Sequence, residues 1–180
     1  MAKYFWYFFF YSFLGFVLEV LFARAVRNPK KDRKCHYFLP VCPVYGLGAV
    51  LILLLPAAVR ERPLLLFPAA AAVCSAAEYG MGLFYEKVAR VQFWDYSELP
   101  LNLGGKVCLP FSLAWGALAL LIVYTVHPYV AALAAAVPAA VTLPAVLFYL
   151  ADALLSLYLL RLARTADVLR WYAHLRPERV

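Results

Sequence analysis

Three acidic residues lie close together in a strongly apolar part of the chain: Glu78, Glu86 and Asp95. A carboxylate in or beside hydrocarbon is costly unless it faces a partner, water or an ion, so an acid in such a place is a functional-site hypothesis. We expect Glu78 to bind a proton, a cation or the amine of a substrate. The alternative is that Glu78 is protonated, or hydrogen-bonded to a neighbouring helix for structural reasons. Glu86 lies beside basic residues. The alternative to a functional role for Glu86 is that it is a solvated charge at the membrane interface.

The residues around Glu78 are spaced as on one face of a helix. Met81, Gly82 and Tyr85 follow Glu78 at i+3, i+4 and i+7, which places all of them on the same side. Gly80 and Gly82 make the helix narrow there, so a neighbouring helix or a substrate is expected to approach closely.

A second unusual stretch is LPVCPVYGLG, residues 39–48. Pro40 and Pro43 predict an extended or turned backbone before a helix starts. Non-helical backbone at membrane depth is tolerated where it is buried in protein or lines a wet cavity, so this stretch is expected to offer free carbonyl or amide groups to a ligand. The alternative is a helix-start turn with Gly46 and Gly48 as small packing residues.

A third stretch, FWDYS at residues 93–97, combines aromatic residues with an acid and a hydroxyl. Its aromatic residues also fit a belt at the membrane interface, and Asp95 also fits a cap of the following turn. Asn102 comes next, and then two glycines beside Lys106, which can form an anion-binding backbone nest.

These stretches and the first apolar segment supply the candidate substrate-binding residues, which are Glu19, Tyr45, Glu78, Tyr79, Glu86, Trp94, Asp95, Tyr96, Asn102 and Lys106. No nucleophile motif, nucleotide-binding loop or HExxH motif is present, so no catalytic residue is assigned. No metal site and no cofactor is predicted, because no standard zinc-site spacing is matched by Cys35, His36, Cys42 and Cys108. The cysteines are expected to be reduced thiols.

The elements that position these residues must be membrane helices. The chain is 66% hydrophobic with a mean hydropathy of +0.78, well above a soluble domain of this length. The composition predicts an all-α polytopic membrane protein, with a transmembrane domain over 1–160 and a basic amphipathic tail helix over 161–180. A span needs about 20 apolar residues. Five spans are expected, over residues 4–22, 38–59, 64–85, 109–126 and 130–160.

The basic residues are distributed unevenly between the two ends of these spans. Fourteen Lys and Arg fall in the loops after the first, third and last spans and in the tail, against three on the opposite side, which are Lys3, Arg60 and Arg62. This bias places the amino terminus outside and the carboxyl terminus in the cytoplasm. The basic groups fit anionic lipid headgroups, so the net charge of +7 needs no nucleic-acid partner.

In this topology the polar groups collect at one depth. Glu19, Glu78 and Asp152 all fall in the cytoplasmic halves of their spans, and the loop around Asp95 follows on the same side. Chance would scatter such groups over both leaflets. We therefore expect a carboxylate-lined cavity that opens to the cytoplasm.

A family resemblance rests on the order of six motifs: FYSFLGFVLEVLF, FLPVCPVYGLG, AEYGMGLFYEK, FWDYS, LNLGGKVCL and FSLAWG. They resemble the family described as putative ABC-transporter type IV, a permease family of Gram-positive bacteria, over roughly Tyr4 to Ala117. The family's acid at the end of the first span is matched by Glu19, its CPxYG motif by residues 42–46 and its WDYS motif by residues 94–97. Its N-x-N-G-R segment is matched in part, with Leu103 after Asn102, then two glycines and Lys106.

The resemblance implies a transporter in a bacterial cell membrane. Because this chain has no ATP-binding motif, an ATPase would be a separate polypeptide, and the segment from Lys87 to Leu99 is the candidate for contacting it. The small size of the chain favours a homodimer or a larger complex. One alternative is an intramembrane enzyme acting on a lipid or prenyl substrate, in which Glu78, Glu86 and Asp95 act as acid and base or hold a divalent cation. Another is an assembly partner that uses the basic tail as its contact.

Overall fold

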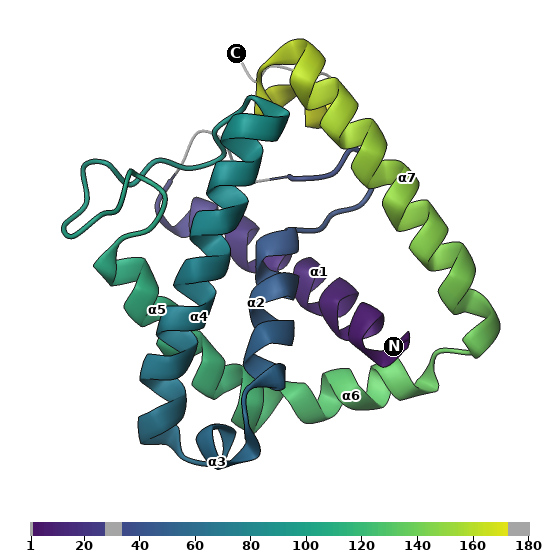
Figure 1. The fold of residues 1–180 in the computed structure, drawn as a ribbon. Coiled ribbons are helices and arrows are strands. Elements are labelled where there is room, and N and C mark those ends of the chain that lie inside the picture. Colours follow the sequence, from purple (N-terminus) through teal and green to yellow (C-terminus); the bar gives the residue numbers. More distant parts are fainter. Residues whose placement is uncertain (1, 28–33, 173–180) are drawn as a thin grey trace.

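The structure is a computed structural model that describes residues 2–27 and 34–172. Four of its helices are long and apolar enough to cross a membrane, and a fifth apolar helix is shorter. The long ones are α1 (Ala2–Ala25), α4 (Pro63–Phe84) with the π-helix η1 (Tyr85–Ala89), α5 (Leu109–Leu121) continuing through the π-helix η2 (Ile122–Val126) into α6 (His127–Ala136), and α7 (Ala139–Ala163). The shorter helix α2 (Pro43–Leu54) is joined to α4 by the single turn α3 (Ala57–Arg60) (Figure 1). An all-α polytopic membrane protein is thus confirmed.

Helices α1 and α2 approach each other at two glycines. A Cβ on Gly15 would overlap the side chain of Tyr45, and a Cβ on Gly46 would overlap the Ser12 hydroxyl and the Phe8 carbonyl oxygen. Small residues at a helix interface allow this close approach, which adds dispersion contacts where lipid gives no hydrophobic driving force. The packing role considered for Gly46 is confirmed.

Four helices pack as a row in which α1 contacts α2, α2 contacts α4, and α4 contacts α5. The core between them is made of fully buried side chains, which include Ile52, Leu66, Ala70, Cys74 and Ala119. Figure 1 shows α2 and α4 side by side at the centre of this arrangement. Helices α1 and α5 are therefore the two ends of the row.

The segment before α2, residues 34–42, has no regular secondary structure and is held by α7. Asp152 of α7 is 2% exposed, and its two carboxylate oxygens each accept a 2.9 Å hydrogen bond, from the amides of Phe38 and Leu39. The Ser156 hydroxyl accepts a 2.8 Å hydrogen bond from the Tyr37 amide. Irregular backbone is stable at membrane depth only when its polar groups are satisfied in this way. The continuous helix in the second apolar segment, α2, is consequently only 12 residues long, and with the separate turn α3 it does not fill the predicted 38–59.

The last apolar region divides at a different place from the predicted one. The helix that was expected to end at residue 126 continues to Ala136, and α7 begins at Ala139. Val137 is extended with ψ 122°, because the ring of Pro138 disfavours the α conformation in the preceding residue. Pro128 follows just after the π-helix η2, so the residue without an amide falls where the hydrogen-bond pattern of the helix is already altered. The predicted break at residues 127–129 is therefore wrong.

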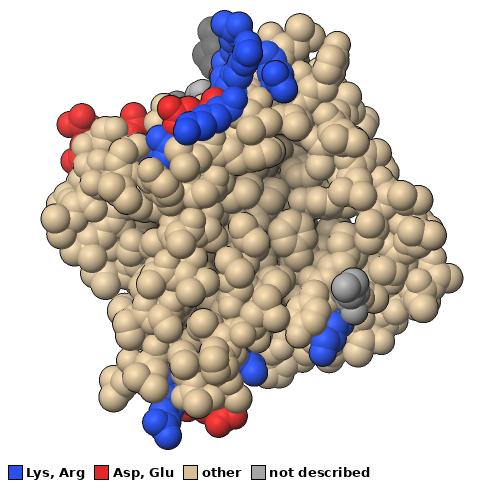
Figure 2. Space-filling view, viewed as in Figure 1, with Lys and Arg blue, Asp and Glu red and all other residues tan. Residues whose placement is uncertain are grey.

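Charged residues gather at two opposite ends of the face in Figure 2, with an uncharged band between them. Arg60, Glu61 and Arg62 lie at the turn between α3 and α4. Elsewhere Glu86 of η1, Arg90 after η1 and Arg164 at the end of α7 line one shallow hollow. This separation is the arrangement expected of a multi-pass membrane protein. The side of the membrane on which each end lies stays a prediction.

The carboxyl-terminal part continues beyond the predicted last span. Helix α7 runs to Ala163, Arg164 is left-handed with φ 54°, and a short 3₁₀ helix, η3, follows at Ala166–Leu169. Leu169 is fully buried, and the indole nitrogen of Trp171 donates to the Tyr37 carbonyl at 3.0 Å. The described part of the tail thus packs on the protein and is not one continuous helix. The predicted tail helix had Leu162, Val168, Leu169, Tyr172 and Leu175 as its apolar positions, and the last of these lies outside the described residues, as do the basic residues of 28–33 and 173–180.

Candidate functional site

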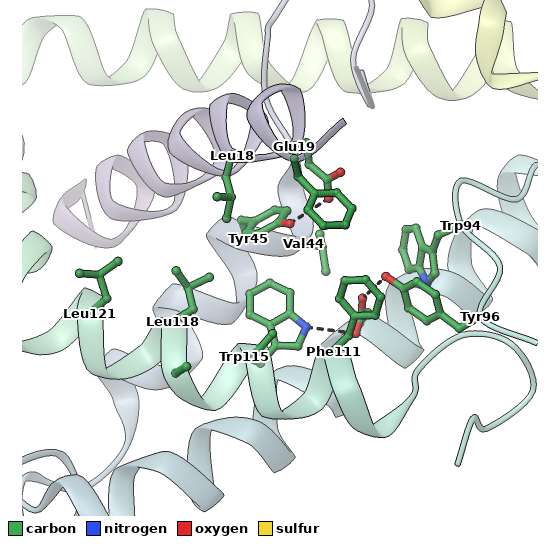
Figure 3. A pocket seen from close by; sticks show the side chains of 14 residues that line it. Leu18, Glu19, Val44, Tyr45, Trp94, Tyr96, Phe111, Trp115, Leu118 and Leu121 are labelled. Atoms are coloured by element: carbon green, nitrogen blue, oxygen red, sulfur yellow. Dashed lines mark hydrogen bonds between the residues drawn. The ribbon is translucent and has the colours of Figure 1, made fainter. Parts of the chain in front are cut away.

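A cavity of about 450 Å³ lies between the four helices of the row. Figure 3 shows side chains of α1 and α5 facing each other across it. The lining comes from α1 (Leu18, Glu19, Phe22), α2 (Val44, Tyr45), α4 (Glu78), α5 (Phe111, Ala114, Trp115, Ala117, Leu118, Leu121) and the loop after η1 (Trp94, Tyr96). Two of these residues carry carboxyl groups, and the rest of the wall is aromatic or aliphatic apart from the tyrosine hydroxyls and the indole nitrogens.

Glu78 is the most enclosed polar group of the cavity, with 4% of its surface exposed. Its Oε1 accepts a hydrogen bond from the Tyr96 hydroxyl at 3.1 Å, and its Oε2 accepts one from the indole nitrogen of Trp115 at 3.0 Å. Each of the two carboxylate oxygens thus has a donor, and the donors come from different elements. Glu78 is therefore held in one orientation at the cavity surface.

Glu19 is the second carboxyl group of the cavity. Whereas Glu78 comes from α4, Glu19 comes from α1. Its Oε1 accepts a hydrogen bond from the Tyr45 hydroxyl at 2.8 Å. The ring of Tyr45 lies 5.0 Å from the ring of Trp115, which in turn contacts Glu78. The two acids are thus connected through one pair of aromatic residues, one from α2 and one from α5 (Figure 3).

The loop after η1 covers one end of the cavity. Tyr96 stacks on Phe111 with ring centroids 4.6 Å apart, and its amide donates to the Gly105 carbonyl at 2.8 Å. The indole nitrogen of Trp94 donates to the Lys106 carbonyl at 2.8 Å. Two aromatic residues of the FWDYS motif, Trp94 and Tyr96, therefore take part in the site, and the backbone of residues 105–106 positions them.

Five of the ten predicted site residues thus line this cavity, and the structure does not bring the others to it. Glu86 forms an ion pair with Lys106, with 2.6 Å between its Oε2 and the Lys106 Nζ, and the side chain of Glu86 is half-exposed. Asp95 is exposed, and its Oδ1 accepts hydrogen bonds from the Ser97 hydroxyl and amide. These bonds lower the pKa of Asp95 below its ordinary value. The remaining predicted residue of α4, Tyr79, is half-buried and is not part of the lining.

Asn102 organises the turn that follows Asp95. Its side-chain amide donates to the carbonyls of Ser97 and Leu99 at 3.0 Å each, and its Oδ1 accepts a hydrogen bond from the Gly105 amide at 3.3 Å. Gly104 and Gly105 both have positive φ. Because Asn102 uses the Gly105 amide, that amide is directed into the loop. The glycines serve the turn, and the predicted anion nest is not supported.

The two glycines next to Glu78 differ in their surroundings. A Cβ on Gly82 would lie 3.2 Å from the Lys106 side chain and 3.4 Å from Trp94. A Cβ on Gly80 would meet nothing within 4 Å. The predicted close approach is therefore found at Gly82, and at Gly80 no neighbouring residue of the described chain is near enough to require glycine.

Sequence reasoning missed the α5 side of the cavity, above all Trp115 and Phe111. A signal was present, because the indole N–H of a tryptophan inside an apolar helix needs an acceptor. Asp152 was expected among the collected acids, but it binds the segment 34–42 and lies 3.4 Å from His36 Nδ1. Among the described residues no three His, Cys, Asp or Glu are placed to share a metal ion.

The chain was compared with curated proteins, solved structures and protein-family models. Neither the curated proteins nor the solved structures gave a match. A family model does match, over residues 6–157. The match extends past Ala117, where the resemblance noted in the sequence ends, and includes Asp152 and its contacts with the segment 34–42. Because it covers most of the chain, this protein belongs to the family described as putative ABC-transporter type IV.

Proposed function

We propose that this chain is a permease-like membrane protein whose cavity binds a cationic solute through Glu78 and Glu19. The observation that carries the proposal is the placement of two carboxyl groups, from α1 and α4, in one cavity of about 450 Å³. Acids inside a membrane domain commonly mark a substrate or ion pathway. The volume is within the range of about 300–1,000 Å³ typical of small-molecule sites.

The aromatic wall supports a cationic ligand in a second way. Trp115, Tyr45 and Tyr96 surround the carboxyl groups. A cation over an aromatic face gains about 0.5–2 kcal/mol, more when water is excluded. A site with two acids and several aromatic faces therefore discriminates strongly against anions.

The enzyme alternative has less support. It requires Glu78, Glu86 and Asp95 to act together, but Glu86 pairs with Lys106 and Asp95 is directed into its own exposed turn. An acid and a base must both be within hydrogen-bond reach of the reacting group. Since these three acids do not share a cavity, the binding function is the better interpretation.

Three further parts of the proposal come from the family and the sequence. The polar end of the cavity is expected to open to the cytoplasm, a separate ATPase to drive the cycle, and a second copy of the chain to complete the transport unit. The segment proposed to contact an ATPase, from Lys87 to Leu99, contains the end of η1 and the loop that covers the cavity. A partner that binds this segment would therefore act on Tyr96 and, through its hydrogen bond, on Glu78.

The test is a binding measurement on the full chain in lipid nanodiscs. We expect ethylammonium to bind and size-matched propionate not to bind, as measured by isothermal titration calorimetry. Glu78→Gln should weaken ethylammonium binding by about tenfold or more, which is about 1.4 kcal/mol. Glu86→Gln is the matched control, because it removes the same charge outside the cavity and should leave the affinity unchanged.

Three results would contradict the proposal. They are equal binding of ethylammonium and propionate, the absence of binding by either, and an equal loss of affinity in the two glutamine variants. Because Glu78→Gln keeps the acceptor for one donor, it is expected to fold, and its thermal unfolding curve checks this. Tyr45→Phe, which removes the hydrogen bond to Glu19, provides a second and milder variant.

A further inference from the structure

The cavity is exposed along one side, and that side lies between two membrane-spanning helices. Its rim residues Leu18 and Phe22 on α1 are 40% and 48% exposed, and Leu121 on α5 is 51% exposed. The smaller lining residues Ala114 and Ala117 of α5 are exposed as well. Both helices are long and apolar enough to span a membrane. Their exposed sides therefore face hydrocarbon, and so does the gap between them.

The gap follows from how the helices are arranged. Helices α1 and α5 are the ends of the row in which α2 and α4 form the middle. The rings of Phe22 and Phe111 pack edge to face near the end covered by the loop, with their centroids 6.3 Å apart. Beyond this contact, small alanine side chains on α5 form the edge of the cavity. The small side chains leave a lateral opening between two helices that are long and apolar enough to span a membrane.

The cavity has a polar end and an apolar end. Glu19, Trp94 and Tyr96 lie toward one end of the view in Figure 3, whereas Leu18, Leu118 and Leu121 lie toward the other. No Lys, Arg or His is among the described residues of the lining. The shape and charge of the cavity are thus those of an amphiphile with a cationic head and an apolar tail.

We propose that the ligand is a hydrophobic amine, with one ammonium head on an alkyl or prenyl tail, and that it enters from the bilayer between α1 and α5. The head would lie between the two carboxyl groups and the face of Trp115. The tail would lie along Leu118 and Leu121 and extend through the gap into the lipid. This inference rests on the proposed function and adds the class of ligand and its route.

Photolabelling of the full chain in lipid vesicles tests the inference. The probe is dodecylamine with a diazirine on its first tail carbons, and the negative control is a dodecyl sulfate with the same diazirine. We expect the amine to label cavity residues of α2 and α5, located by mass spectrometry, and the sulfate to label the lipid-facing surface only. Labelling of cavity residues by both probes, or by neither, would overturn the inference.

Variants of the gap test the route separately from the site. Ala117→Trp fills the edge of the opening and should reduce cavity labelling by dodecylamine about fivefold or more, since the large indole would occupy the space through which an alkyl chain has to pass. Ala151→Trp on the exposed surface of α7 is the matched control and should have no effect. Both sites are exposed, so neither change disturbs the core. Equal labelling of the two variants means that the ligand does not pass between α1 and α5.

Binding of ethylammonium distinguishes a failure of this inference from a failure of the proposed function, which is the binding of a cationic solute. If ethylammonium binds in a Glu78-dependent manner but dodecylamine does not label the cavity, the cation site exists, and the proposal that its ligand is a hydrophobic amine from the bilayer is wrong. If neither amine binds, the proposed function fails, and the inference fails with it.

Discussion

The indole nitrogen of Trp115 lies 3.0 Å from Oε2 of Glu78 and donates a hydrogen bond to it. Both residues are buried, and they come from neighbouring helices, α5 and α4. Trp115 also contacts the ring of Tyr45, and the hydroxyl of Tyr45 donates a hydrogen bond to Glu19. One tryptophan thus links the two carboxyl groups of the cavity and forms part of its wall. Its removal should affect both the stability of the helix pair and the orientation of the acid.

We predict that Trp115→Phe lowers the free energy of unfolding in detergent by about 1–3 kcal/mol, because a buried carboxyl oxygen loses its donor. Trp171→Phe is the control. Trp171 also donates through its indole, but it is 44% exposed, so water can replace the bond. Thermal or denaturant unfolding, followed by circular dichroism, compares the two. Equal losses would show that Glu78 does not depend on the indole.

Asp152→Ala should destabilise the protein by about 2–6 kcal/mol, since two buried backbone amides each lose an acceptor at about 1–3 kcal/mol. The amides are those of Phe38 and Leu39. Release of this segment should also speed the reaction of the buried thiols Cys35 and Cys42 with maleimide. Glu98→Ala, which removes an exposed acid, is the control and should change neither quantity. Unchanged thiol reactivity in Asp152→Ala would mean that α7 does not hold the segment.

The two glycines Gly46 and Gly80 should respond oppositely to alanine. Gly46→Ala places a methyl group against the Phe8 carbonyl oxygen, a backbone atom that cannot move alone, and should cost about 1–3 kcal/mol. Gly80→Ala meets nothing within 4 Å and should stabilise α4 by about 0.5–1 kcal/mol. Melting temperatures of the two variants decide between this packing and a different rotation of α2 or α4. The packing is wrong if Gly46→Ala is neutral.

The turn at Asp95 should depend on pH in acid. The Ser97 hydroxyl and amide donate to its carboxylate, which lowers the pKa from the ordinary value of 3.8. A carboxyl group whose pKa is lower in the folded protein stabilises the fold above its ordinary pKa, and this contribution disappears as the pH falls through the folded value. We expect the fluorescence of nearby Trp94 to change below about pH 4. Asp95→Asn should abolish this transition, and its persistence in the variant would assign it to another group.

The resemblance and the composition together predicted much of the fold. Runs of apolar residues gave the four long helices, because a span must be both helical and hydrophobic. The two prolines Pro40 and Pro43 correctly predicted extended or turned backbone before the second helix. The apolar runs did not show that residues 34–42 as a whole lack regular secondary structure, because hydropathy is the same for a chain buried in lipid and a chain buried in protein. The acceptor that stabilises this segment, Asp152, is more than a hundred residues away in the sequence. Only the packing of α7 brings it into contact.

The same distinction holds for the candidate site. The sequence by itself determined that acids such as Glu19 and Glu78 stand in apolar segments, where hydrocarbon makes an unpartnered carboxyl group costly. The tertiary structure decided which of the acids meet. Glu78 faces Trp115 and Tyr96 because of how α4 and α5 are rotated against each other, whereas Glu86 is two turns further on and pairs with Lys106. Residue type sets the energetic need for a partner, and the packing of distant segments decides which partner is in reach.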